Sequence, residues 1–189
     1  MSRPYVVAIA GGTCSGKSTL TDRLEALFAP RCQTVAFHLD GYFKKEPPNT
    51  VAPITRKTYV EHNSPDTLEL GRMYEDFRRI TADGSDAGLV LVEGLFALYL
   101  DELRERADLK IFVDLESDER LARRIVRFMS WGQTFEEVTE RYLDTVRFRH
   151  KELIEPTRWH ADLVLNGVLD RGQGVDVAAC FIEKKMGLC

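Results

Sequence analysis

The sequence predicts an α/β fold in which one doubly wound parallel sheet carries helices on both of its faces. One observation behind this prediction is that short apolar stretches alternate with segments of helical periodicity along the chain. Strands separated by helices are typical of a parallel sheet covered on both faces. Another is a glycine-rich segment, residues 11–18, between the first expected strand and the first expected helix. With 189 residues and no repeat or low-complexity linker, residues 1–189 are expected to form a single domain.

The first part of the chain carries two strand signals, one helix signal and a long polar segment. Residues 5–10 are apolar and rich in β-forming side chains, which predicts a buried strand. Residues 19–28 have the spacing of a helix with one apolar face. That face consists of Leu20, Leu24, Leu27 and Phe28. Residues 34–38 predict a second strand, and the proline-containing segment 41–65 predicts a functional loop region.

The middle of the chain continues the alternation. Residues 66–80 predict a helix with Asp66 as its N-cap. The side chains expected to face the core from this helix are Leu68, Met73, Phe77 and Ile80. A third strand is expected at residues 89–92, a helix around 99–106 and a fourth strand at 110–114.

The last third of the chain contains three further helices and one strand. Ser117 is expected to cap the helix after the fourth strand, and residues 134–153 predict another long helix. A short fifth strand is expected at residues 163–165, followed by a closing helix at 175–185. The chain therefore supplies five strands for one sheet.

The composition favours a soluble globular protein. Apolar residues make up 44% and charged residues 30% of the chain, and no stretch approaches the length of a membrane span. The net charge of −4 argues against nucleic acid as the main partner. The first strand begins almost at once, so we expect no signal peptide. The cysteines, at positions 14, 32, 180 and 189, show no metal-binding spacing, and a reducing cytoplasm suits them best.

Residues 11–18 match the pattern G-x-x-x-x-G-K-[S/T] at every fixed position. Backbone N–H groups of such a turn, aimed at a helix N-terminus, form a site for a polyphosphate. Lys17 can reach the outer phosphates, and the Ser18 hydroxyl can hold Mg²⁺. The residues expected to bind the nucleotide are therefore Gly11, Gly12, Thr13, Cys14, Ser15, Gly16, Lys17, Ser18 and Thr19.

Three acidic residues, Asp40, Glu93 and Asp114, end expected strands. Ligands bind at the carboxyl ends of strands in such sheets, so a carboxylate there can hold Mg²⁺ beside Ser18, directly or through water. A carboxylate that faces the γ-phosphate can also accept the proton of an attacking hydroxyl. Asp40 suits this second role, because the loop after it can close over an acceptor. Asp40 and Glu93 are thus candidate metal ligands with Ser18, whereas Asp114 is explained equally well by the start of a turn.

A stripe of arginines follows the fourth strand on one face of a helix. The stripe consists of Arg120, Arg123, Arg124 and Arg127, and an apolar face of Leu121, Ile125 and Phe128 lies beside it. Like charges on one face repel one another unless an anion faces them. The phosphates of a bound nucleotide would supply that anion, since phosphoryl transfer depends mainly on positioning and charge neutralisation.

Taken together, these residues resemble the uridine kinase and phosphoribulokinase family of P-loop kinases over nearly the whole chain. The segments that carry the resemblance are 11–19, 38–43, 63–66, 91–94, 123–127, 155–157 and 161–162. The resemblance implies a P-loop NTPase fold with strand order 2-3-1-4-5, ATP as donor, and an arginine-containing helical lid at about residues 120–150. It makes Asp40 the catalytic aspartate and Glu93 a residue that helps to hold magnesium.

The resemblance also implies a site for each substrate. Lys17, Asp40 and Arg127 are expected to act in catalysis, and Arg123 and Arg124 to bind ATP. The expected contacts to the acceptor come from Asp40, Tyr42, Phe43, Asn63 and Arg127.

Three departures from the family leave the acceptor open. Uridine kinases carry a pyrimidine-gripping β-hairpin before the E-G strand, and residues 82–88 are too short for it. Asn63 stands where the family has a substrate-binding aspartate, and residues 131–133 replace an R-G-R element of the lid. Residues 40–44 are also similar to nicotinamide riboside kinases, a related branch without that hairpin. Aromatic residues that can stack on a base or simply cover a cleft are Tyr42, Phe43, Tyr59 and Trp131.

The sequence favours an ATP-dependent kinase of a nucleoside or ribosyl-type metabolite over the other readings. A nicotinamide riboside kinase-like or other metabolite kinase is the nearest alternative, and a nucleotide-dependent switch ATPase is an alternative of a different class. The guanine-reading N-K-x-D element of signalling GTPases and an L-S-G-G-Q-like ABC signature are both absent from the chain. The expected partner is a small-molecule hydroxyl acceptor, with no membrane partner, and a homo-oligomer is one of the assembly states left open.

Overall fold

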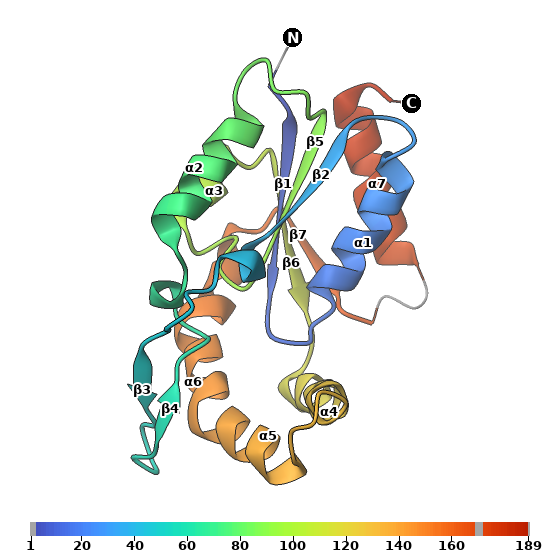
Figure 1. Ribbon diagram of the computed structural model, residues 1–189. Coiled ribbons are helices and arrows are strands. Elements are labelled where there is room, and N and C mark those ends of the chain that lie inside the picture. Colours follow the sequence, from blue (N-terminus) through green and yellow to red (C-terminus); the bar gives the residue numbers. More distant parts are fainter. Residues whose placement is uncertain (1–2, 169–171, 189) are drawn as a thin grey trace.

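A computed structural model describes residues 3–168 and 172–188 and contains a central parallel sheet between two layers of helices (Figure 1). The strands of this sheet are β1 (Tyr5–Gly11), β2 (Thr34–His38), β5 (Leu89–Glu93), β6 (Leu109–Asp114) and β7 (Leu163–Asn166). Their order is β2-β5-β1-β6-β7, and all neighbours run parallel. Counted along the chain, this is the expected order 2-3-1-4-5, so both the fold class and the sheet topology are confirmed.

Helices cover both faces of the sheet. The α-helices are α1 (Lys17–Phe28), α2 (Leu70–Thr81), α3 (Asp101–Arg106), α4 (Ser117–Met129), α5 (Phe135–Arg141), α6 (Arg147–Arg149) and α7 (Gln173–Met186), of which α4, α5 and α6 lie beyond the lower end of the sheet in Figure 1. Helices α1 and α7 pack on one face, and α2 and α3 on the other (Figure 1). Alternate residues of β1 enter the two layers: Val7 packs with α1 and α7, and Val6 with α2 and α3. Because both faces are covered, residues 6–10 are fully buried.

The helix expected at 134–153 is one helical run with irregular hydrogen bonding. Helix α5 continues into a π-helical segment (Tyr142–Val146), then into α6 and a second π-helical segment (His150–Ile154), and a 3-10 segment (Glu155–His160) ends the run. Thr134 begins it with a capping box, in which its hydroxyl accepts from the backbone of Glu137 and the Glu137 carboxylate accepts from the backbone of Thr134. Such π-helical segments often occur at functional sites, because they change the direction in which successive side chains point.

The segment 41–65, predicted to be a functional loop region, also contains regular secondary structure. A short antiparallel hairpin, β3 (Asn49–Val51) and β4 (Thr58–Val60), lies within it. Each of these strands has only three residues, and both are largely exposed, so they lack the apolar alternation that predicts a strand. A 3-10 turn (Leu39–Tyr42) directly follows β2.

Several boundaries differ from those expected. Asp66 does not cap α2: the Ser64 hydroxyl caps a separate 3-10 turn (Pro65–Thr67), and α2 begins only at Leu70. Ser117 is the first residue of α4 and makes no capping hydrogen bond. Leu27 is 47% exposed, because it lies at the edge of the face that buries the other apolar residues of α1.

Two further properties bear on the sequence expectations. No helix in the described part of the chain has both the length and the apolar character needed to cross a membrane. Cys14, Cys32 and Cys180 are free thiols, and Cys189 lies outside the described residues.

Candidate active site

The glycine-rich loop between β1 and α1 has the backbone conformation that its glycines allow. Gly11 and Gly16 have φ angles of 149° and 106°, and Cys14 has a φ of 57°. A side chain at Gly11 would place its Cβ 2.3 Å from the carbonyl oxygen of Val113 on β6. Gly16 has no side chain that could cap α1, so the first N–H groups of this helix are left to a ligand. The loop therefore presents main-chain donors in the manner of a phosphate site.

A prediction follows from this close approach. Gly11→Ala should lower the free energy of unfolding by about 1–3 kcal/mol, because its methyl group would overlap a backbone oxygen of the neighbouring strand. Urea unfolding would measure the loss. Gly71→Ala is the matched control, since nothing lies within 4 Å of the added carbon and the residue is in a helix, where Ala is favoured. Equal stabilities of the two variants would contradict the steric argument.

Lys17 contacts both the phosphate loop and a carboxylate at the end of β5. Its Nζ atom is 3.4 Å from the carbonyl oxygen of Gly12 and 3.6 Å from Oε1 of Glu93. The other oxygen of Glu93 lies 3.0 Å from Nδ1 of His38. Both Lys17 and Glu93 are buried, so this ion pair is poorly screened by solvent. Glu93 is thereby held at the end of β5, beside the loop, as the sequence led us to expect.

Asp40 lies in the 3-10 turn directly after β2 and reaches the same cavity as Lys17 and Ser18. Because the Asp40 carboxylate is shielded from water by the surrounding protein, its pKa is raised above the ordinary value. Lys17 and Arg127 oppose this rise in the pKa, and Glu93 adds to it. The prediction that Asp40 faces the phosphate loop is thus supported by its position. A raised pKa is typical of a carboxylate that exchanges protons.

Of the remaining side chains at residues 13–19, some line the cavity and others do not. Thr13, Cys14 and Ser18 line the cavity with Lys17, and Ser18 is exposed there. Ser15 is fully buried, and its hydroxyl has no hydrogen-bond partner within the part of the chain that the structure describes. Thr19 is exposed but does not line the cavity.

The arginine stripe of α4 faces the phosphate loop. Arg120 and Arg124 are buried, and the Arg124 guanidinium donates to the hydroxyl of Thr13 over 2.9 Å. Arg120 donates to the carbonyl of Leu115 and packs against Gly12. Burial lowers the pKa of Arg124, although a guanidinium remains charged at neutral pH. The buried side of α4 is therefore made by arginines, and its apolar residues are only partly covered.

The other two arginines of the stripe have different positions. Arg127 lies at the cavity and stacks on the ring of Trp131, with 4.8 Å between the guanidinium carbon and the ring centroid. Arg123 does not line the cavity, because its guanidinium donates to the carbonyl of Gly167 over 3.1 Å. Gly167 in turn lies directly against the backbone of Ser15.

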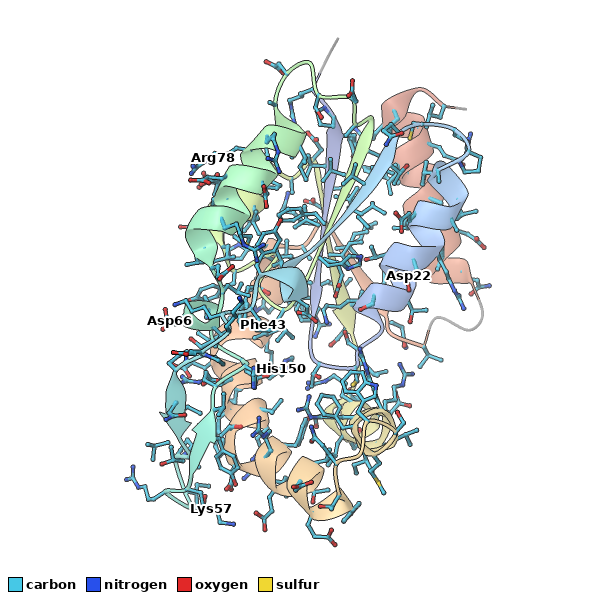
Figure 2. All side chains as sticks on the ribbon, viewed as in Figure 1. Asp22, Phe43, Lys57, Asp66, Arg78 and His150 are labelled. Atoms are coloured by element: carbon cyan, nitrogen blue, oxygen red, sulfur yellow. The ribbon has the colours of Figure 1, made fainter. Side chains whose placement is uncertain are left out.

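These elements enclose a cavity of about 360 Å³. It is lined by Thr13, Cys14, Lys17, Ser18, Asp40, Phe43, His62, Asn63, Leu95, Arg124, Arg127, Phe128, Trp131, Gln133 and Arg141. In Figure 2, Phe43 points toward the interior between the sheet and the helical run, whereas Asp22 and Arg78 project outward. The structure thus brings the phosphate loop, Asp40 and the lid arginines to one space.

Two aromatic residues named from the sequence do not reach this space. The Tyr42 hydroxyl donates to Asp76 on α2, and its ring packs on Phe37. The Tyr59 hydroxyl donates to Asp144 in the helical run. Tyr42 is thus not among the residues that line this cavity, because its side chain turns into the α2 layer, and its expected contact with the substrate stays a prediction. Phe43, Asn63 and Trp131 do line the cavity, as expected.

Sequence reasoning missed His62 and Arg141. A buried carboxylate fixes the segment that carries His62: Glu61 accepts from the backbone N–H groups of His62 and Asn63 and pairs with Arg149. Arg141 comes from the end of α5, far away in the sequence. Neither residue had a motif that marked it, since each reaches the cavity only through tertiary packing.

The comparisons with known proteins agree with this geometry. A model of the Phosphoribulokinase / Uridine kinase family matches residues 81–173. A uridine kinase of Clostridium novyi (strain NT) is 32% identical over 184 residues, which cover 87% of this chain and 88% of that protein. The chain belongs to the phosphoribulokinase/uridine kinase family. It is therefore an ATP-dependent phosphotransferase that acts on a hydroxyl group.

Two further relatives show the breadth of the family around this chain. Uridine-cytidine kinase B of Dictyostelium discoideum is 30% identical over 203 residues, which cover 97% of this chain and 83% of that protein. The structure of phosphoribulokinase from Rhodobacter spheroides aligns with a TM-score of 0.60 at 16% identity, over 87% of this chain and 70% of that one. This second likeness supports the fold alone. In this chain, the short connection 82–88 between α2 and β5 contains no helix or strand.

Proposed function

We propose that this chain transfers the γ-phosphate of ATP to a hydroxyl of a nucleoside or other ribosyl-type metabolite. The observation that carries the proposal is that Asp40 lines the same cavity as Lys17 and Ser18 of the phosphate loop, and that the charge of Lys17 acts on its carboxylate. A hydroxyl placed between them would meet a proton acceptor on one side and a bound phosphate on the other. The uridine kinases among its relatives support an acceptor of the nucleoside class.

The residues at the loop suit a magnesium ion. The Ser18 hydroxyl and the carboxylates of Asp40 and Glu93 are hard oxygen donors, and Ser18 and Asp40 open onto the cavity. The described residues contain no cluster of three or more His, Cys, Asp or Glu side chains suited to a metal. In proteins, Mg²⁺ is commonly held by one or two carboxylates together with substrate phosphates. When bound with ATP, the ion neutralises charge that develops on the phosphates.

The chain's own groups then perform the transfer. A bond forms between the acceptor oxygen and the γ-phosphorus, and the bond from that phosphorus to the β–γ bridging oxygen breaks. The Asp40 carboxylate takes the proton of the hydroxyl. Lys17, the loop amides and Arg124 hold the triphosphate, and Arg127 balances the charge on the transferring group. We propose that residues 120–150 form the lid that closes over these groups and excludes water.

Arg127→Ala is expected to reduce turnover more than the affinity for ATP. Its guanidinium lies at the cavity but has no described contact with the loop backbone, so its main effect should fall on the transition state. A loss of about 10²-fold or more in kcat is expected, with a change of a few-fold in the Kd of ATP. Steady-state kinetics and calorimetry would measure the two effects. Arg78→Ala, on the outer side of α2, is the control (Figure 2).

A nicotinamide riboside kinase-like activity is the second candidate function. The observation that favours it is the short connection 82–88, which leaves no hairpin to hold a pyrimidine base. Phe43 and Trp131 remain at the cavity and can stack on either kind of base.

A thermal-shift screen would test the proposed function. Nucleosides, ribosylnicotinamide and small hydroxylated metabolites would each be added with a non-hydrolysable ATP analogue, and stabilising compounds would then be tested for acceptor-dependent release of ADP. Lys17→Ala serves as the inactive control. ATP turnover that no acceptor increases would favour a switch ATPase and would contradict the proposal.

We propose the cytoplasm as the location, because the free thiols of Cys14, Cys32 and Cys180 persist in a reducing compartment. The net charge of −4 supports small molecules rather than nucleic acid as partners.

A further inference from the structure

The hairpin of β3 and β4 connects two parts of the active cavity along the chain. Phe43 precedes the hairpin, His62 and Asn63 follow it, and all three residues line the cavity. Most side chains of residues 49–60 are exposed, and none belongs to either apolar core in the part of the chain that the structure describes. The hairpin is therefore held in place by contacts other than the burial of apolar side chains in these cores.

Hydrogen bonds hold the hairpin against the helical run that follows α4. The hairpin lies alongside this run at the lower end of the molecule (Figure 1). Asp144 is buried in the π-helical segment after α5, and its carboxylate accepts from the hydroxyls of Thr55 and Tyr59 over 2.6 and 2.7 Å. These two hydrogen bonds lower the pKa of Asp144. Its carboxyl group is therefore ionised at neutral pH, and both hydrogen bonds are charge-assisted.

Two weaker contacts join the hairpin to α5. The guanidinium of Arg141 lies over the ring of Tyr59, with 5.6 Å between its central carbon and the ring centroid. Lys57, at the far end of the hairpin (Figure 2), is paired with Glu140 over 2.8 Å. Both members of this ion pair are exposed, so it contributes little to holding the hairpin. The hydrogen bonds to Asp144 are therefore the main link at this end of the hairpin.

Glu61, directly after β4, forms a second link to the helical run. It is only 2% exposed, and its carboxylate accepts from the backbone N–H groups of His62 and Asn63 over 3.0 and 2.7 Å. The same carboxylate pairs with Arg149 of α6 over 2.9 Å. Arg149 also donates to the hydroxyl of Thr50 on β3 over 3.3 Å. One buried carboxylate thus connects the run to both the hairpin and the segment that lines the cavity.

We propose that Glu61 and Asp144 are positioning residues for the phosphate acceptor, which fix the cavity wall of His62 and Asn63 relative to the helical run. This inference rests on the proposed kinase function and adds two residues that do not themselves line the cavity. Asn63 is one of the expected contacts to the acceptor. A wall that is already held by hydrogen bonds costs less to order when the acceptor binds, so the two links favour acceptor binding.

A double variant, Thr55→Val with Tyr59→Phe, tests the link through Asp144. It removes both donors and nearly keeps the size of each side chain. Kinetics use an acceptor found in the thermal-shift screen, with uridine and ribosylnicotinamide tried first. The KM of the acceptor should rise about 10-fold, whereas kcat and the Kd of ATP should change by less than about 2-fold. Tyr74→Phe is the matched control, since the Tyr74 hydroxyl has no hydrogen bond to the described residues.

Glu61→Gln tests the second link. Gln has nearly the same size as Glu, but it cannot form the ion pair with Arg149 or accept from both backbone N–H groups with charged oxygens. The KM of the acceptor should again rise about 10-fold at an unchanged Kd of ATP. Glu105→Gln, at an exposed position of α3, is the matched control for the loss of one negative charge.

Hydrogen exchange of the free protein measures the link to Asp144 without any acceptor. The amides of residues 49–63 should exchange at least about 10-fold faster in the double variant than in the wild type. The amides of β1 should exchange at an unchanged rate, because the hairpin lies outside both apolar cores. Unchanged exchange of residues 49–63 would reject the link.

The kinetic outcomes separate this inference from the proposed function. An unchanged KM of the acceptor in both variants, or a loss that falls on kcat or on ATP affinity, would reject the positioning role and leave the kinase function standing. If no compound of the screen stimulates ADP release by the wild type, the proposed function fails and this inference fails with it. Thermal unfolding of each variant excludes a general loss of structure.

Discussion

Asp40→Asn is expected to reduce phosphotransfer by about 10²–10⁴-fold while the chain still folds and binds ATP. Asn has nearly the same size as Asp, so the 3-10 turn after β2 can keep its shape, but an amide cannot accept the proton of the attacking hydroxyl. Acceptor-dependent ADP release would measure the loss in kcat, and calorimetry would measure the Kd of ATP. Near-normal turnover would remove Asp40 from the mechanism.

The pH profile gives a second readout for Asp40. The carboxylate acts as a base only when ionised, and its pKa is raised above 3.8, so kcat/KM should increase with pH through that raised pKa. This acidic limb should be absent from the residual activity of Asp40→Asn. A raised carboxylate pKa also makes the folded chain less stable as pH rises from the ordinary to the raised value. The variant should therefore be at least as stable as the wild type at pH 7. Asp22→Asn, on the exposed side of α1, is the control (Figure 2).

Lys17→Ala is expected to abolish productive binding of ATP and to lower kcat/KM by at least about 10²-fold. Its ammonium group is the loop's only side-chain cation, and it is held beside the carbonyl of Gly12 and the carboxylate of Glu93. Removing it takes a positive charge from the phosphate site and leaves the buried Glu93 paired with His38 alone. Calorimetry with a non-hydrolysable ATP analogue and magnesium would measure the effect.

Lys184→Ala, at the exposed end of α7, is the matched control for this loss of charge. It should leave both ATP affinity and turnover unchanged. An unaltered ATP affinity in Lys17→Ala would contradict the assignment of residues 11–18 as the phosphate site.

The local patterns of this chain predicted its sheet well, because buried strands leave a strong apolar signal. The apolar stretches at residues 5–10 and 89–92 correspond to β1 and β5, whose side chains are buried except for that of Tyr5, which is partly exposed. The hairpin of β3 and β4 escaped prediction for the same reason, since its short strands are exposed and bury little apolar surface. The predicted helix cap was wrong. Asp66 was expected to cap this helix, but α2 starts only at Leu70, and Ser64 caps a separate 3-10 turn that precedes it.

The candidate site was also predictable only in part. The phosphate loop and Asp40 were predictable because both follow from residues adjacent in the chain: a glycine-rich turn at a helix start and a carboxylate at a strand end. The sequence predicted that the four arginines share one face of a helix, but it did not predict which of them reach the phosphate loop. Arg120 and Arg124 turn inward, whereas Arg123 is held by the carbonyl of Gly167.

The sequence by itself determined that this chain builds a parallel α/β sheet with a phosphate loop at its first strand, since short-range spacing encodes both features. Only the tertiary structure decided what surrounds the acceptor. Helix α5 carries Arg141 to the cavity, Glu61 holds the segment of His62 and Asn63 at the same cavity, and Tyr42 turns away into the α2 layer. These contacts join residues far apart in the chain, and packing between elements sets them rather than the periodicity within any one element.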